Sequence, residues 1–189
     1  MLVIFGLVTY ATKGVSFGAI EPAIPKMIIP KINGFPTIIL WAVAAIVIVW
    51  FIWNKTTFGK NLYAVGGNPE AAAVSGISVF GVTMGAFILA GILYGFGSWL
   101  ECARMVGSGS AAYGQGWEMD AIAACVVGGV SFTGGIGKIS GVVVGVLIFT
   151  VLIYSLTILG IDTNLQFVFE GIIIITAVTL DCLKYVQKK

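Results

Sequence analysis

Long apolar runs alternate with short polar segments along this chain. Four runs are predicted to cross a membrane as helices: Thr37–Trp53, Val79–Leu100, Ile139–Leu159 and Leu165–Leu180. A membrane span needs about 20 mainly apolar residues, within a range of about 17 to 25. The pattern therefore predicts an all-α polytopic membrane protein.

Two further apolar runs are too short to span a membrane. Met1–Tyr10 has the character of the end of a helix that begins earlier, and Ala121–Val130 is interpreted as a half-span or broken helix that leads into the glycine-rich turn Ser131–Lys138. The segment Ala11–Pro36 holds four of the five prolines and is predicted to be a loop. We expect about four to five transmembrane or half-spanning helices in one domain that covers the whole chain.

Composition indicates that lipid is the solvent. Hydrophobic residues make up 59% of the 189 residues and charged residues only 10%, with a mean hydropathy of +1.06. A soluble domain carries about 25% charged residues, so a chain of this length could not hide this much apolar surface in a core of its own. The net charge of +2 gives no reason to expect a nucleic acid partner.

Few residues are suited to catalysis or metal binding. The sequence has no histidine, which excludes histidine acid–base catalysis and histidine metal ligands. Cys102, Cys125 and Cys182 are far apart and form no CxxC pair, so they are interpreted as packing residues. The Gly-Lys pair at 137–138 is followed by isoleucine and is no phosphate-binding loop. We predict no metal site, no cofactor and no enzymatic activity, so any ATP must bind another chain.

The polar loop Asn54–Ser78 carries a helix start signal of its own. Asn68 is a good N-cap, Pro69 suits the first helical position, and Gly76 can end the helix about two turns later. An acidic first turn and a run of alanines favour the helix between them. Two interpretations stay open from the residues alone. The segment is an ordinary interfacial helix, or it is a coupling helix whose small side chains fit a groove on a partner protein.

Basic residues give the orientation of the chain. Six of the ten basic residues lie on one side of the membrane if the Asn54–Ser78 loop, the glycine-rich turn and the C-terminal tail are all placed there. The six are Lys55, Lys60, Lys138, Lys184, Lys188 and Lys189. The side with more basic residues is expected to be cytoplasmic. On the outer side, Glu101, Arg104, Glu118 and Asp120 are interpreted as solvated loop ends.

Glu170 is a charge inside a predicted span. Such charges are costly and often functional, so a secondary transporter or channel that uses Glu170 is an alternative function, and a membrane scaffold is a third class.

Glycines four residues apart are a different signal. They occur at Gly137, Gly141 and Gly145 and again at Gly91 and Gly95, and this spacing predicts close helix packing.

Three segments of the chain resemble one known family. They are TFGKNLYAVGGNPEAAAVSGISV from Thr57, DAIAACVVGGVSFTGGIGKISGVVVGVLIF from Asp120, and GIIIITAVTLDCLKYVQKK from Gly171. These segments are similar to the permease subunits of sugar-type ABC importers, the ribose/galactose class, and most similar to its galactose/methyl-galactoside type. They occur in the family's order, and the resemblance runs from near Met1 to the C-terminus.

The resemblance implies the rest of a transport machine. In this family a periplasmic sugar-binding protein delivers a monosaccharide, two permease copies form the pathway in the bacterial inner membrane, and ATP-binding subunits dock on cytoplasmic loops. By resemblance the docking residues are Asn68, Pro69, Glu70, Ala71, Ala72 and Gly76. The region near the pathway would include Gly128, Gly129, Ser131, Gly134 and Gly135.

The resemblance also implies two differences. Family members are longer, so this chain is expected to correspond to their C-terminal part and to lack their N-terminal helices. They also commonly carry a basic residue where this chain has Glu170.

Overall fold

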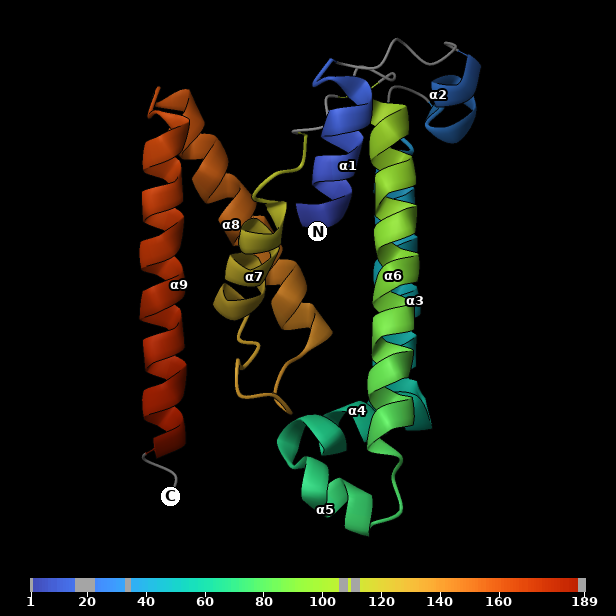
Figure 1. Ribbon diagram of the computed structural model, residues 1–189, viewed down its shortest axis with the longest axis vertical. Coiled ribbons are helices and arrows are strands. Elements are labelled where there is room, and N and C mark those ends of the chain that lie inside the picture. Colours follow the sequence, from blue (N-terminus) through green and yellow to red (C-terminus); the bar gives the residue numbers. More distant parts are fainter. Residues whose placement is uncertain (1, 16–22, 33–34, 106–108, 110–112, 187–189) are drawn as a thin grey trace. The chain divides into compact units, whose positions relative to one another are not determined.

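The computed structural model describes residues 2–15, 23–32, 35–105, 109 and 113–186. The helices are α1 (Leu2–Thr12), α2 (Ala23–Ile28), α3 (Ile38–Lys55), α4 (Thr57–Gly67), α5 (Pro69–Val74), α6 (Val79–Arg104), α7 (Trp117–Val127), α8 (Ile139–Ile158) and α9 (Thr163–Val186) (Figure 1). The antiparallel strands β1 (Lys31–Ile32) and β2 (Phe35–Pro36) have two residues each. The expected helical fold class is confirmed.

Three of the described helices are long and apolar enough to cross a membrane: α3, α6 and α8. The apolar part of α9, Thr163–Thr179, is shorter than a full span. No residue of α3 is buried, and apolar side chains such as Val47 and Ile48 are more than half exposed. Since water would penalise such a surface, lipid must cover it, and the chain is a multi-pass membrane protein.

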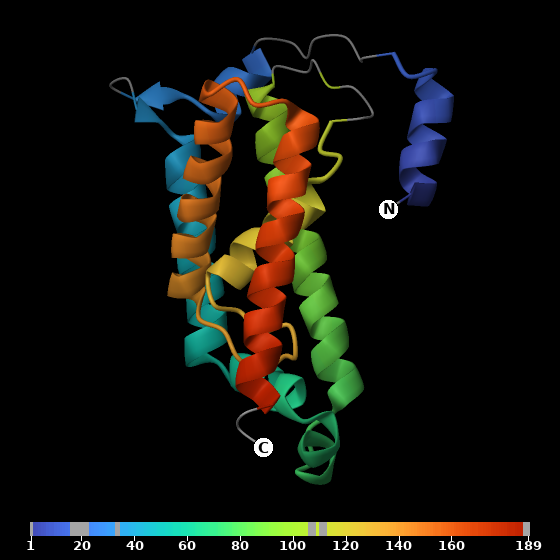
Figure 2. The same cartoon turned by 90° about the vertical axis from the view of Figure 1, so that its left-hand side faces the viewer.

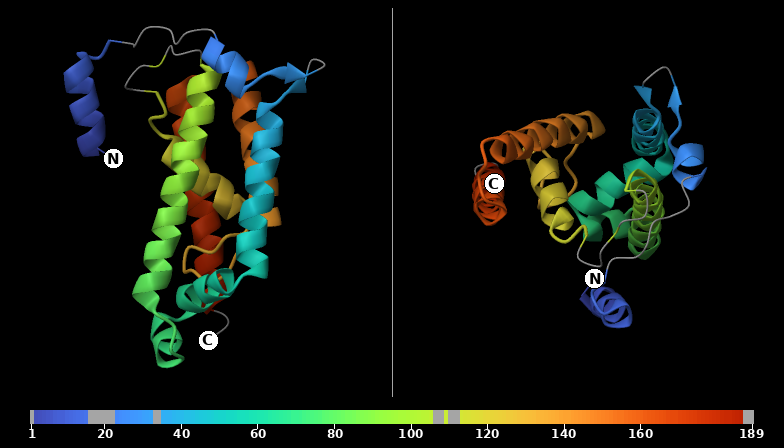
Figure 3. Two further views of the ribbon diagram at one scale, coloured as in Figure 1. Left: turned by 90° about the vertical axis from the view of Figure 1, so that its right-hand side faces the viewer. Right: turned by 90° about the horizontal axis from the view of Figure 1, so that it is seen from above.

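The chain divides into two compact units, whose boundaries fall within α3 and α6. The first unit consists of residues 1–48 and 84–115. In it, α2 and the β1–β2 hairpin lie near the N-terminal end of α3 (Figure 3). Trp41 of α3 meets Phe96 and Trp99 of α6 edge-on, with ring centroids 6.0 and 6.3 Å apart. This geometry is favourable for aromatic pairs and joins the two helices.

The second unit consists of residues 49–83 and 116–189. Within it, α7 packs against both α8 and α9 (Figures 1 and 2). The buried residues at this junction are Ala123, Ala124 and Phe149, and Ile153, Ile173 and Ile174 pack around them. The two alanines leave room for the neighbouring helices to approach α7 closely.

Glycine brings α7 and α8 into backbone contact. A Cβ atom added to Gly128 would lie 2.5 Å from the carbonyl oxygen of Gly141, and one added to Gly145 would lie 2.6 Å from the amide nitrogen of Gly128. Neither atom fits without a backbone shift. Gly141 and Gly145 therefore act as the predicted packing stripe. A Cβ atom at Gly91 or Gly95 of α6 would meet nothing within 4 Å, so that stripe has no partner among the described residues.

Two predicted loops contain regular structure. The segment Ala11–Pro36 was expected to be a loop, but it includes α2 and the β1–β2 hairpin. Pro25 is the third residue of α2 and lies in the first turn, where a missing N–H breaks no helical hydrogen bond. The segment Asn54–Ser78 was expected to hold one short helix, but it holds α4 as well as α5.

Candidate functional site

The helix α5 forms as the sequence predicts, because its end signals are local. The Asn68 side chain accepts a hydrogen bond from the Ala71 amide at 3.0 Å, and Pro69 takes the first helical position. Beyond the helix, the Ile77 amide donates to the Ala72 carbonyl at 3.0 Å, and Gly76 adopts a φ of +82°. This left-handed residue ends the helix in a way that suits glycine.

Most of α5 is open to a partner. Glu70, Ala71, Ala73 and Val74 are exposed, and Val74 is 91% exposed. Ala72 is the one buried residue of the helix. An exposed short helix with a small-residue surface and an apolar tip can enter a groove on another protein.

The preceding helix, α4, holds α5 in place and begins directly after α3. Thr56 caps α4: its hydroxyl accepts from the Gly59 amide at 3.3 Å and donates to the Ile52 carbonyl of α3 at 2.6 Å. A Cβ atom on Gly59 would lie 2.6 Å from the carbonyl carbon of Trp53. The corner between α3 and α4 is therefore too tight for any residue except glycine at position 59.

The structure joins α4 to the glycine-rich turn Ser131–Lys138, two elements that the sequence presents as separate. The Tyr63 hydroxyl donates to the Gly137 carbonyl at 2.7 Å, across 74 residues of sequence. A Cβ atom on Gly66 would lie 2.6 Å from the Gly135 amide nitrogen, and one on Gly134 would lie 2.5 Å from the Gly66 carbonyl oxygen. Sequence reasoning did not identify Tyr63 or Gly66 as functional residues; the Gly-Gly pair at 66–67 was its one available signal.

The turn itself has a defined backbone. The Ser131 amide donates to the Ile136 carbonyl at 3.0 Å, and the Ser131 and Thr133 hydroxyls lie 2.8 Å apart. Gly129 just before the turn and Gly134 and Gly135 within it have φ values of +82°, +91° and +68°. These three glycines occupy the left-handed region, so the turn requires glycine for conformation as well as for its contact with α4.

A buried acidic pair lies where α7 meets α9. Glu170 is 4% exposed, and its carboxyl group lies close to that of Asp120. Its Oε1 atom has no hydrogen-bond partner among the described residues. Asp120 was expected to be a solvated loop end, but it is partly buried and faces Glu170. Two ionised carboxyl groups repel each other at close range, and a proton on one of them relieves the repulsion.

Two other expected outer residues, Glu101 and Arg104, form a surface cluster in the first unit. Arg104 Nε donates to Glu101 at 3.0 Å, and its Nη2 donates to the Tyr113 hydroxyl at 3.0 Å. The Tyr113 hydroxyl also donates to the Glu101 carboxylate, which raises the pKa of this phenol above its usual value. Since the cluster is solvent-exposed, it stabilises the local loop by no more than about 1 kcal/mol.

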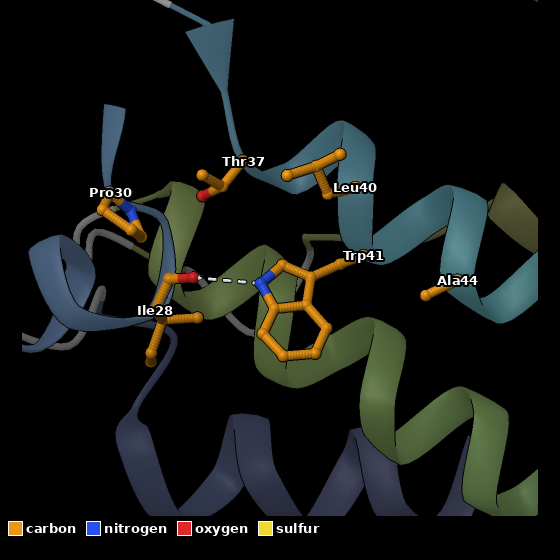
Figure 4. A pocket seen from close by; sticks show the side chains of 6 residues that line it. All are labelled: Ile28, Pro30, Thr37, Leu40, Trp41 and Ala44. Carbon is orange, nitrogen blue, oxygen red and sulfur yellow. Dashed lines mark hydrogen bonds between the residues drawn. The ribbon is translucent and has the colours of Figure 1, made fainter. Parts of the chain in front are cut away.

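The first unit also contains a cavity of about 350 Å³ (Figure 4). Its lining residues are Ile28, Pro30, Thr37, Leu40, Trp41 and Ala44. The indole N–H of Trp41 donates to the Ile28 carbonyl at 3.2 Å, and the buried Thr37 hydroxyl has no partner among the described residues. One hydroxyl in an apolar lining is too little to recognise a polyhydroxy ligand. Among the described residues no three His, Cys, Asp or Glu side chains gather to hold a metal ion.

Comparison with known proteins supplies the family. The family model described as branched-chain amino acid transport system / permease component matches residues 1–178. The chain belongs to this permease family. It is 55% identical to the galactose/methyl galactoside import permease protein of Treponema pallidum, over 100% of this chain and 37% of that protein. It is 53% identical to the Escherichia coli protein of the same name, over 80% of this chain and 45% of that protein.

A more distant member of the permease family is the ribose import permease protein of Bacillus subtilis. It is 42% identical over 78% of this chain and 46% of that protein. The chain thus spans less than half the length of these permeases. No solved structure matches the chain.

Proposed function

We propose that this permease-family chain is a transmembrane subunit of an ATP-driven importer for monosaccharides in a bacterial inner membrane. The single observation that carries the proposal is the exposed, fully capped helix α5, seated beside α4 in a family of permeases. The two relatives with the highest identity quoted above are named for galactose and methyl galactoside import, so we propose a galactose-like sugar as the substrate.

In this proposal α5 docks an ATP-binding subunit on the cytoplasmic side. Asn68, Pro69, Glu70, Ala71, Ala72 and Gly76 build the helix, and its exposed residues make the contact. A periplasmic sugar-binding protein and a second permease copy complete the machine. The chain itself makes and breaks no covalent bond.

The shortness of helix α7 supports the proposal that the glycine-rich region lies beside the pathway. With 11 residues, α7 is about 16 Å long and cannot cross a hydrocarbon core of about 30 Å. Irregular backbone is tolerated at membrane depth only where protein buries it or where it lines a cavity. We therefore propose that Gly128, Gly129, Ser131, Gly134 and Gly135 lie near the translocation pathway.

Docking through α5 predicts a selective loss of partner binding. Val74→Glu places a charge at the 91% exposed apolar tip of α5 and should weaken the affinity for the ATP-binding subunit at least about tenfold. Thr57→Glu is the matched control, because it adds the same charge at an exposed first-turn position of α4. Affinity would be measured in detergent with the purified subunits. Equal binding by both variants would rule out docking through α5.

One observation favours a second candidate. The buried Glu170 has one oxygen without a partner among the described residues, and it lies near another carboxyl group, as an ion- or proton-handling residue within a membrane helix would. A gradient-driven carrier that uses Glu170 would need no ATP-binding subunit, so the docking measurement separates the two functions.

A further inference from the structure

The close contact between α4 and the glycine-rich turn has no role in the docking surface itself. It nevertheless has backbone approaches nearly as tight as those between α7 and α8. A Cβ atom on Gly135 would lie 2.7 Å from both the amide nitrogen and the Cα atom of Gly67. With the Gly66 approaches and the Tyr63–Gly137 hydrogen bond, Gly134, Gly135 and Gly137 of the turn are all in contact with the last two turns of α4.

The contact is one link in a continuous series within the second unit. At one end, the Asn68 amide donates to the Ala64 carbonyl at 3.0 Å, so α5 follows α4 without a flexible linker. At the other end, the turn connects α7 to α8, whose backbones meet at Gly128 and Gly145. Every link is a backbone contact or a hydrogen bond to backbone.

Contacts of this kind transmit displacement well. A long side chain can change rotamer when its neighbour moves, whereas two backbones separated only by glycine Cα atoms have no rotamer to change. The Tyr63 hydroxyl adds a directional restraint between α4 and the turn. If α5 moves with a docked partner, the turn must move or the contact must break.

We propose that the contact between α4 and the glycine-rich turn carries the displacement of docked α5 to α7 and α8, with Tyr63 and Gly66 as its positioning residues. The proposal rests on the docking function proposed above. It adds to that function a route by which nucleotide-driven motion at the docking surface reaches α7. Tyr63 and Gly66 act through other residues and touch neither sugar nor nucleotide.

The test is amide hydrogen exchange in the peptide that covers Ser131–Lys138. It would be measured on the full chain in lipid nanodiscs, with and without the ATP-binding subunit and a non-hydrolysable ATP analogue. In the wild type, docking with nucleotide should change exchange in this peptide by about fivefold or more, the lower end of typical coupling between sites. Affinity for the ATP-binding subunit is measured separately on the same samples.

Two variants break the contact and two matched variants leave it intact. Tyr63→Phe removes one hydroxyl and its bond to Gly137, and Gly66→Ala adds a methyl group facing the Gly135 amide. Gly67→Ala is the control for the second, because a Cβ atom there meets nothing within 4 Å. Tyr154→Phe in α8 is the control for the first, since that tyrosine is 68% exposed.

The expected result is that Tyr63→Phe and Gly66→Ala retain affinity for the subunit but lose the change in exchange, while both controls behave as the wild type. If the wild type binds the subunit and the turn does not respond, or if Tyr63→Phe responds in full, the proposal is overturned and docking through α5 stands. Failure of the wild type to bind the subunit would overturn the docking function, and this inference with it.

Discussion

Gly145→Val is expected to lower the free energy of unfolding by about 3 kcal/mol, the upper end of the usual cost of overpacking. The Cβ atom of the new side chain would lie 2.6 and 2.7 Å from the amide nitrogen and Cα of Gly128, and closer still to the Ala124 carbonyl oxygen. These are backbone atoms of α7, so no rotamer change can make room. The helices must separate, which opens the buried contact of Ala123 and Ala124 with Phe149. Equilibrium unfolding in detergent, followed by circular dichroism, measures the loss.

The matched control is Gly91→Val in α6. The same atoms are added to a glycine inside a long apolar helix, but a Cβ atom there meets nothing within 4 Å. Because valine and glycine differ little in helix propensity, a change below about 0.5 kcal/mol is expected. Equal losses for the two variants would show that the close approach of α7 and α8 does not stabilise this protein.

The long helices could be predicted because their signal is contained in the local run of apolar residues. The predicted span Val79–Leu100 begins at the same residue as α6, and the predicted span Ile139–Leu159 differs from α8 by one residue at its end. The helix α4 was missed for the opposite reason. Its sequence holds three glycines, which disfavour a helix, and it depends on the Thr56 cap and on contacts with distant residues.

In the candidate site, too, the features set by neighbouring residues could be predicted and those set by distant residues could not. The caps of α5 at Asn68 and Gly76 follow from residues a few positions apart, so the sequence predicts them correctly. The hydrogen bond of Tyr63 to Gly137 joins residues 74 positions apart, and a tyrosine in a polar loop gives no sign of such a partner. Glu170 stood out as a charge in an apolar run, yet its neighbour Asp120 was assigned to a loop, since nothing local indicates that α7 and α9 are packed together.

Glu170→Gln is expected to raise the free energy of unfolding by about 1–2 kcal/mol at neutral pH. Two ionised carboxyl groups would repel each other in a site that is 4% exposed at Glu170, so the wild-type pair is strained unless one group holds a proton. An amide at position 170 has nearly the same shape and donates its own N–H to the Asp120 carboxylate. Unfolding in detergent measures the change, and Glu70→Gln, at an exposed position of α5, is the control.

A double-mutant cycle with Asp120→Asn shows whether the effect belongs to this pair. Each single variant leaves one carboxylate and one amide in contact, whereas the double variant removes the carboxylate acceptor, so the two gains should fall short of additivity by about 1 kcal/mol. Additive effects, or a loss of stability in both single variants, would contradict a strained acidic pair.

The same Glu170→Gln protein also decides between the two candidate functions. A carrier driven by a proton gradient needs a group that can gain and lose a proton at position 170, and it would lose transport with the amide, whereas an ATP-driven importer that holds Glu170 only by packing would keep it.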